Sequence, residues 1–234
     1  MSTSAHSPRR RRAPARSRGR PPVDADSDVR SALLDAASRL FLKHGFDRVT
    51  ARQIAVAAGT TAAMIHYYFG NKLGLFRAML ERAIAPVREL IAGTLSQAGA
   101  VVDPAVLIRM HMRTAAANPW IATLIVNEVL AEKGRFRGTF IRDFAGRQAP
   151  LVIELLQRAR TNGKLRDDLD VRLAALSLLS LCMFPFLARA VAGPVLGLKF
   201  DDDDDIEHLI AHTARLFAAG TEPAARTTRQ EHRA

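Results

Sequence analysis

Apolar residues recur along most of this chain at spacings of three and four, the pattern of helices that bury one face. No segment alternates apolar and polar residues as a half-buried strand does, so the sequence predicts an all-α fold. Pro86 and Pro150 each predict a kink or a break in a helix, and Gly193-Pro194 with Gly197 predicts a loop. The expected helices cover residues 27–44, 51–57, 62–69, 71 to the nineties, 104–117, 119–133, 137–161, 168 or 170 to about 191, and 201–205 to about 220.

Residues 50–72, TARQIAVAAGTTAAMIHYYFGNK, predict two short helices joined by a tight turn. Thr50 is a favourable N-cap for the first helix, Gly59 allows a left-handed turn, and Thr60 or Thr61 can cap the second helix. Four apolar residues are spaced to share a small core: Ile54, Ala58, Ile65 and Phe69. This layout is typical of a helix-turn-helix that binds DNA.

Residues 28–80 resemble the DNA-binding segment of the TetR family of transcriptional regulators. The resemblance rests on Ala36-Ala37, Phe41, Gly45-Phe46, Thr50, Ile54-Ala55, Ala58-Gly59, Thr61, Tyr67-Tyr68-Phe69 and Lys72. It implies an N-terminal three-helix helix-turn-helix DNA-binding domain, followed by a C-terminal helical domain for ligand binding and dimerisation. The expected parts are a disordered basic arm (1–26), the DNA-binding domain (27–76), the regulatory domain (77–220) and a flexible tail (221–234).

The side chains expected at DNA fall into two groups. Those expected to hold phosphates and fix the register are Thr50, Thr61, Tyr67, Tyr68 and Lys72. Those expected at base edges or in the groove are Arg52, Gln53, Ala62, Ala63 and His66. The two alanines lie on the first turn of the second helix, where small residues allow close approach to DNA.

The net charge of +11 is concentrated at the N-terminal end. Residues 1–22 contain seven Arg and no acid, whereas residues 78–234 are nearly balanced, which agrees with DNA binding at that end. Arg18-Gly19-Arg20-Pro21 resembles the core of an AT-hook, whose arginines enter a narrow, A·T-rich minor groove. The alternative is a basic tail that only raises non-specific affinity.

A ligand cavity is expected among the middle helices, because the family resemblance implies one. Its candidate apolar residues are Met112, Trp120, Leu124, Phe140, Phe144 and Phe184. Asn127 and Glu128 interrupt an apolar helix and could orient a polar group of the ligand. The alternative for each residue is ordinary packing.

Two apolar stripes near the C-terminus are candidates for dimerisation. They consist of Leu176, Leu179, Met183 and Phe186 on one helix, and of Leu209, His212, Leu216 and Phe217 on the next. The resemblance implies that such a pair forms a four-helix bundle with the pair of a second copy. The alternative is that both stripes pack inside one chain.

Several other classes of protein are disfavoured. The single Cys182 excludes an intramolecular disulfide and suits a reducing cytoplasm, and we expect it to be a small core residue. The uncharged run 173–188 is short for a membrane span. His208 and His212 have a metal-compatible spacing without an obvious third ligand, so neither metal nor cofactor is expected. No nucleophile–base pair or phosphate-binding glycine loop indicates an enzyme.

The sequence therefore predicts a cytoplasmic, homodimeric, ligand-responsive regulator that binds double-stranded DNA. We expect a repressor that a small, largely apolar molecule releases from a palindromic operator. The alternative from another class is an architectural DNA-binding protein that acts through the arginine-rich arm with little sequence preference. In that case, deletion of residues 1–22 would abolish binding.

Overall fold

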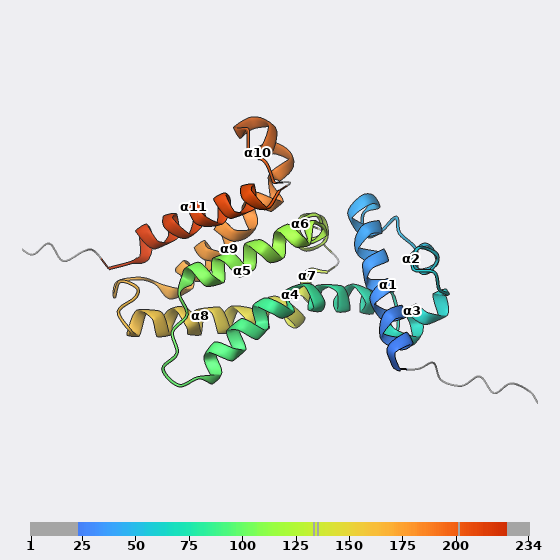
Figure 1. The fold of residues 1–234 in the computed structure, drawn as a ribbon, viewed down its shortest axis with the longest axis horizontal. Coiled ribbons are helices and arrows are strands. Elements are labelled where there is room, and N and C mark those ends of the chain that lie inside the picture. Colours follow the sequence, from blue (N-terminus) through green and yellow to red (C-terminus); the bar gives the residue numbers. More distant parts are fainter. Residues whose placement is uncertain (1–22, 133, 135, 201, 224–234) are drawn as a thin grey trace, which may run out of the picture.

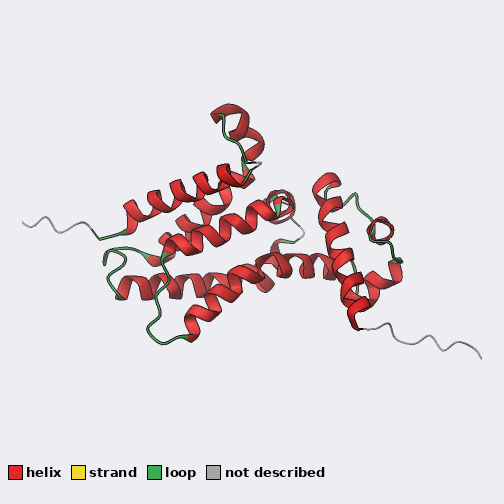
Figure 2. Ribbon diagram, in the orientation of Figure 1, coloured by secondary structure: helices red, strands yellow, loops and turns green. Residues whose placement is uncertain are grey.

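The computed structural model describes residues 23–223 except 133, 135 and 201, and every regular element in that part of the chain is helical (Figure 2). The predicted all-α fold is confirmed. The elements are α1 (Val23–His44), α2 (Ala51–Ala57), α3 (Ala62–Phe69), α4 (Lys72–Ser96), α5 (Pro104–Ala117), α6 (Pro119–Leu124), the π-helix η1 (Ile125–Leu130), α7 (Arg137–Phe140), the π-helix η2 (Ile141–Ala145), α8 (Gly146–Thr161), α9 (Val171–Leu187), α10 (Arg189–Leu196) and α11 (Asp203–Thr221).

Helices α1, α2 and α3 form a separate group at one end of the molecule, on the right in Figure 1. Thr50 caps α2 as predicted, because its hydroxyl accepts a hydrogen bond from the Gln53 backbone N–H at 3.2 Å. The Gln53 side-chain oxygen accepts in return from the Thr50 backbone N–H at 2.8 Å, which completes a capping box. Gly59 turns the chain with φ +68°, a conformation that a residue with a Cβ adopts only under strain. Ile54 and Ile65 are fully buried, so the predicted core of the helix-turn-helix is confirmed.

Helix α4 connects this group to the rest of the molecule. It runs through Pro86 as one helix and bends along its length (Figure 1). Of the two outcomes predicted at Pro86, the bend agrees with a kink, and a break does not occur. Near its start, Leu75, Phe76 and Met79 are buried in the core of the N-terminal group. Further along, Val87 and Ile91 belong to the core of the C-terminal body.

The C-terminal body is built from α5, α8, α9 and α11 with the second part of α4, and α5 contacts both α9 and α11. Arg113 on α5 forms ion pairs with Asp203 at 2.7 Å and with Glu207 at 2.6 Å on α11, and Arg109 also pairs with Glu207. Asp202 caps α11 by accepting from the Asp205 N–H. The acidic run therefore begins a helix and pairs it with α5.

A shared cluster of aromatic rings joins the two ends of the molecule. Phe46, in the turn after α1, lies 4.6 Å from Phe136, which follows η1, and Phe136 stacks on Phe76 of α4 at 4.8 Å. Trp120 and Leu124 of α6 are buried in the same cluster. The N-terminal group is therefore packed into the body through side chains as well as joined to it through α4.

Several predicted boundaries were wrong. α1 begins at Val23 rather than at Ser27, since an N-cap preference of about 1 kcal/mol does not by itself decide where a helix starts. The expected helix 119–133 ends at Leu130 as a π-helix, and the expected helix 137–161 changes type at Ile141 but runs through Pro150. The predicted loop at residues 193–197 is largely helical, because α10 continues through Pro194 to Leu196 and ends at Gly197, which has a left-handed backbone.

Residues 1–22 and 224–234 lie outside the described part of the chain. The expectations for residues 1–22 of the basic arm, with Arg18 and Arg20, and for most of the tail concern these residues, whereas residues 23–26 of the predicted disordered arm are the first turn of α1. Helix α11 itself extends to Thr221, one residue beyond the predicted limit of the regulatory domain.

Candidate nucleic-acid interface and ligand cavity

Helix α3 presents an outward face made of residues predicted to contact DNA. Thr61 occupies the N-cap position without using its hydroxyl for a capping bond, and Ala63 is exposed beside it. Tyr67 is 64% exposed, and His66 is exposed with its Nδ1 donating to the Gly70 carbonyl at 2.8 Å. Ile65 anchors the opposite side of the helix in the core. The helix is therefore held from behind, and its front is open to a partner.

The neighbouring residues at α2 are partly committed within the protein. Arg52 is exposed, whereas the side chains of Thr50 and Gln53 engage each other through the capping box. Tyr68 is half-buried, with its ring 4.9 Å from that of Tyr67. Ala62 is likewise half-buried on the first turn of α3.

Lys72 occupies a different environment from the other predicted DNA contacts. Its ammonium donates to the Phe46 carbonyl and lies 4.0 Å from the centroid of the Phe46 ring. Burial lowers the pKa of Lys72, and the nearby carboxylate of Glu128 opposes that shift. In this structure Lys72 ties the start of α4 to the turn after α1 through one of its three N–H donors.

A cavity of about 280 Å³ lies in the body between α4, α5, α8 and α9. Phe140 and Phe144, both predicted to contact ligand, line it together with apolar residues of the surrounding helices. The other apolar lining residues are Leu80, Ile84, Val87, Ala115, Ile121, Ile125, Ala145, Ala149, Val152, Leu179 and Met183. Three polar residues complete the wall: His111, Thr114 and Gln148.

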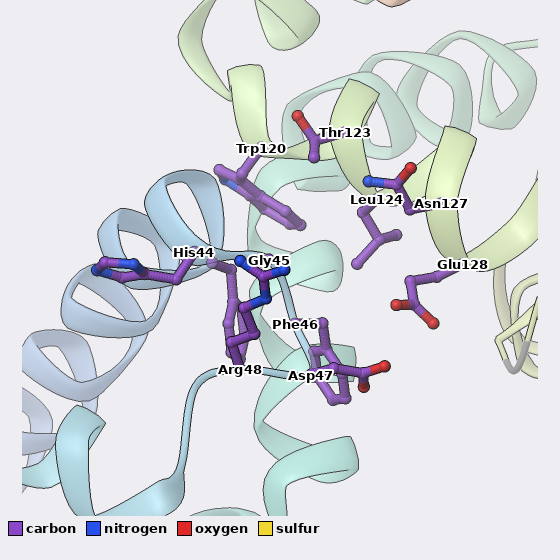
Figure 3. A pocket seen from close by; sticks show the side chains of 11 residues that line it. His44, Gly45, Phe46, Asp47, Arg48, Trp120, Thr123, Leu124, Asn127 and Glu128 are labelled. Atoms are coloured by element: carbon purple, nitrogen blue, oxygen red, sulfur yellow. The ribbon is translucent and has the colours of Figure 1, made fainter.

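The other residues predicted to contact ligand lie elsewhere. Met112 is fully buried in the core beside the cavity. Phe184 is 66% exposed on the outside of α9: Met183 faces the cavity, and the next residue of a helix points about 100° away. Trp120, Leu124, Asn127 and Glu128 line a separate groove between α6–η1 and the turn after α1 (Figure 3).

His111, Thr114 and Gln148 were not among the predicted ligand contacts. A signal in the sequence existed for Gln148, because it follows the predicted cavity residue Phe144 by four positions and so lies on the same face of the helix. His111 and Thr114 share a face with each other but not with a predicted cavity residue.

Comparisons with known proteins agree with this arrangement. Residues 33–79 match the family described as "Bacterial regulatory proteins, tetR family", and residues 105–216 match the "Tetracyclin repressor-like, C-terminal domain". The chain belongs to the TetR family. The two matches cover the helix-turn-helix and most of the body of this TetR-family regulator.

Individual TetR-family relatives extend over most of the chain. The transcriptional repressor AcnR of Corynebacterium diphtheriae is 26% identical over 81% of this chain and 93% of its own length. The repressor NicS of Pseudomonas putida is 28% identical over 67% and 74%. NalD of Pseudomonas aeruginosa, a repressor of a multidrug efflux pump, has a solved structure with a TM-score of 0.61 and 25% identity, which covers 85% of this chain and all of NalD.

One further solved structure shows the fold alone. FadR of Bacillus subtilis, in complex with stearoyl-CoA, has a TM-score of 0.64 at 18% identity and covers 81% of this chain and 98% of FadR. These proteins are transcriptional regulators, which is the class that the helix-turn-helix predicts.

The C-terminal helices of this TetR-family chain carry an exposed apolar surface. It comprises Leu173, Leu176 and Phe184 of α9, Val191, Val195 and Leu196 of α10, Leu198, and Leu216 of α11. Figure 1 shows α10 projecting from the body near the start of α11. Of the predicted stripe residues, Leu176 and Leu216 belong to this surface, whereas Phe186 and Phe217 are buried in the core of their own chain.

The prediction of which face of α9 points outward was therefore wrong, because the outward face is rotated about the helix axis from the predicted stripe. Leu179 and Met183 line the cavity, whereas Leu173, Leu176, Ser180 and Phe184 face outward. On α11, His212 and Leu216 are exposed as predicted and Leu209 is half-buried. Serines in the outward stripe made it look less apolar than the stripe that is buried.

Among the described helices, no single one has both the length and the apolar composition to cross a membrane. Only α9 and α10 taken together reach those limits, and they are bent by 76° relative to each other.

Proposed function

We propose that this chain is a homodimeric repressor that binds a palindromic operator and is released by a small, largely apolar effector. The outward face of α3 supports specific DNA binding, the exposed surface of α9–α11 supports dimerisation, and the cavity supports an effector. Two recognition helices related by a dimer axis read two half-sites one helical turn apart or a multiple of that distance. A location in the cytoplasm, where the operator would be, is part of this proposal.

The observation that carries the proposal is the continuity of α4. Leu80 and Ile84 line the cavity, and one turn before them Phe76 is buried in the core of the helix-turn-helix. A ligand that displaces α4 at the cavity must also displace the group that holds α3. If the ligand prefers the displaced arrangement, bound ligand lowers the affinity of the protein for the operator. The factor is the same as that by which the ligand binds the operator-free protein more tightly than the operator-bound protein.

A second connection runs through η1. Ile125, its first residue, lines the cavity, and Glu128 lies within electrostatic reach of Lys72 at the start of α4. Burial raises the pKa of Glu128, and the Lys72 ammonium opposes that shift. Movement of either end of η1 would therefore alter the contact that fixes the first turn of α4.

In the bound state, Thr61 and Tyr67 contact phosphates, and Ala63 and His66 approach base edges. Thr61 keeps its hydroxyl unused by the cap, and the other three side chains are exposed on α3. Arg52, on α2, reaches the DNA groove that α3 enters. Loss of a phosphate contact weakens all sequences alike, whereas loss of a base contact relaxes the preference at one position.

Selection of bound duplexes from a random library, with the full-length protein at physiological salt, tests the DNA-binding part. A palindrome is expected, and a Tyr67→Ala variant should recover the same palindrome with weaker binding. An exposed residue remote from α3, as in Arg147→Ala, serves as the matched control. Recovery of A·T-rich DNA without a palindrome, lost on deletion of residues 1–22, would instead favour the architectural alternative.

Titration of the protein–operator complex with cavity ligands tests the effector part. A ligand that binds in the cavity should lower operator affinity, and a Leu80→Trp variant that fills the cavity should become insensitive to it. An effector that binds tightly and leaves operator affinity unchanged would refute the proposed release.

A further inference from the structure

We propose that the effector is a small, uncharged, largely apolar molecule with at least one O–H or N–H group that donates a hydrogen bond inside the cavity. This inference rests on the proposed function, since it assigns a chemical class to the ligand of the same cavity. It is drawn from the polar atoms of the wall and from the side chains that surround them.

The first acceptor in the cavity wall is the side-chain oxygen of Gln148. That oxygen is buried, and none of the described residues donates a hydrogen bond to it. A buried polar atom without a partner is costly, and it raises the affinity of any ligand that supplies the missing donor. Gln148 lies on α8, one turn after Phe144, which also lines the cavity.

The second acceptor belongs to His111 on α5. Its Nδ1 lies 2.8 Å from the Leu107 carbonyl, which can only accept, so Nδ1 carries the proton. Burial lowers the pKa of His111, and the bond to Leu107 opposes that shift without cancelling it, so the ring is neutral at pH 7. Nε2 of the neutral ring therefore carries a lone pair, which makes it an available acceptor on a residue that lines the cavity.

The rest of the wall disfavours a charged ligand. None of the described residues that line the cavity is Lys, Arg, Asp or Glu, and apolar side chains make up most of the wall. A carboxylate, phosphate or ammonium would lose its hydration there without gaining an opposite charge, which is strongly unfavourable. A molecule that contributes only acceptors would also leave Gln148 and His111 without donors.

The size of the cavity limits the ligand further. A volume of about 280 Å³ corresponds to roughly nine times the 30 Å³ that a water molecule occupies in the liquid. A single substituted ring fits this volume. Alkylphenols have the required shape, the single donor and the neutral charge.

The test uses full-length protein and a series of 4-alkylphenols from 4-methylphenol to 4-pentylphenol, each paired with its methyl ether and with the 4-alkylbenzoate. Affinities are measured by calorimetry and checked by the shift in melting temperature. At least one phenol should bind about tenfold more tightly than its ether, since one hydrogen bond to a buried acceptor is of that magnitude. The benzoates should bind more weakly than the phenols.

A Gln148→Met variant keeps the length of the side chain and removes its acceptor. This variant should reduce the difference in affinity between a phenol and its methyl ether, and the affinity for the ether should stay unchanged. Arg147→Met, at the exposed neighbouring position of the same helix, should leave that difference unchanged. If Gln148→Met does not fold, a His111→Phe variant tests the second acceptor in the same way.

Equal binding of phenol and ether, tighter binding of the benzoate, or no binding by any phenol of the series would each overturn the inference. Failure of the proposed function looks different. A phenol that binds better than its ether but leaves operator affinity unchanged would refute effector-driven release and support the assigned ligand chemistry. Release of the operator by the ethers at the same concentrations would support effector-driven release and refute the assigned ligand chemistry.

Discussion

Replacing Leu176 with Ser tests the proposed dimer surface, because Leu176 is 62% exposed in the single chain and belongs to the outward stripe on α9. Full burial of a leucine side chain contributes about 1.5–3 kcal/mol, so covering the exposed part contributes about 1–2 kcal/mol per copy. A two-fold dimer contains the residue twice, which gives about 2–4 kcal/mol for the substitution. The dimer dissociation constant should therefore rise roughly 30- to 1,000-fold.

Leu130 at the end of η1 supplies a matched control, because it is also 62% exposed but lies away from α9–α11. Sedimentation equilibrium of the two serine variants measures the dissociation constants, and circular dichroism confirms that both are folded. Leu130→Ser should dimerise like the wild type. Equal dissociation constants for Leu176→Ser and the wild type, with both proteins folded, would show that the dimer forms through another surface.

Three further predictions concern the interior of one chain. The hydrogen bond from Arg109 holds the pKa of Glu207 below its ordinary value of 4.5, so its stabilising effect is present above that pH and is lost as the pH falls. Glu207→Gln should therefore lower stability in urea at about pH 7, and the difference from wild type should shrink as the pH falls below 4.5; a constant difference would contradict this. Burial raises the pKa of Cys182 to about 12, so a thiol reagent at about pH 8 should label it only in denaturant, and rapid labelling of the folded protein would be the contrary result. Arg137 donates to the carbonyls of Val129 at 2.9 Å and Ala131 at 2.6 Å at the end of η1, so its replacement by Ala should cost about 1 kcal/mol in urea unfolding, against no change for Arg147→Ala.

The helix-turn-helix was predictable from sequence because its determinants are local. Thr50 and Gln53 lie three residues apart and form the predicted cap, and Gly59 stands where a left-handed turn is required. The order of the apolar residues around these positions fixes both helices within a residue. No distant contact has to be known in order to place them.

The cavity and the exposed apolar surface of α9–α11 were less predictable because they depend on how whole helices are rotated. On α9 nearly every residue is apolar, so periodicity alone does not distinguish Met183, which faces the cavity, from Phe184, which faces outward. The division is decided by the neighbouring helices α5 and α8, whose positions are set by tertiary packing. Likewise, the inward position of Lys72 depends on the Phe46 carbonyl, 26 residues earlier in the chain.

The aromatic cluster of Phe46, Phe76 and Phe136 has a consequence for the construction of hybrid regulators. A chimaera joined in the turn before α4 would keep Phe46 on the DNA-binding side and would take Phe76 and Phe136 from the recipient body. The rings of the two parents would then have to fit each other, or a gap would open inside the fused protein. A productive exchange of operator specificity should therefore transplant only the outward residues of α3, and leave both halves of the cluster from one parent.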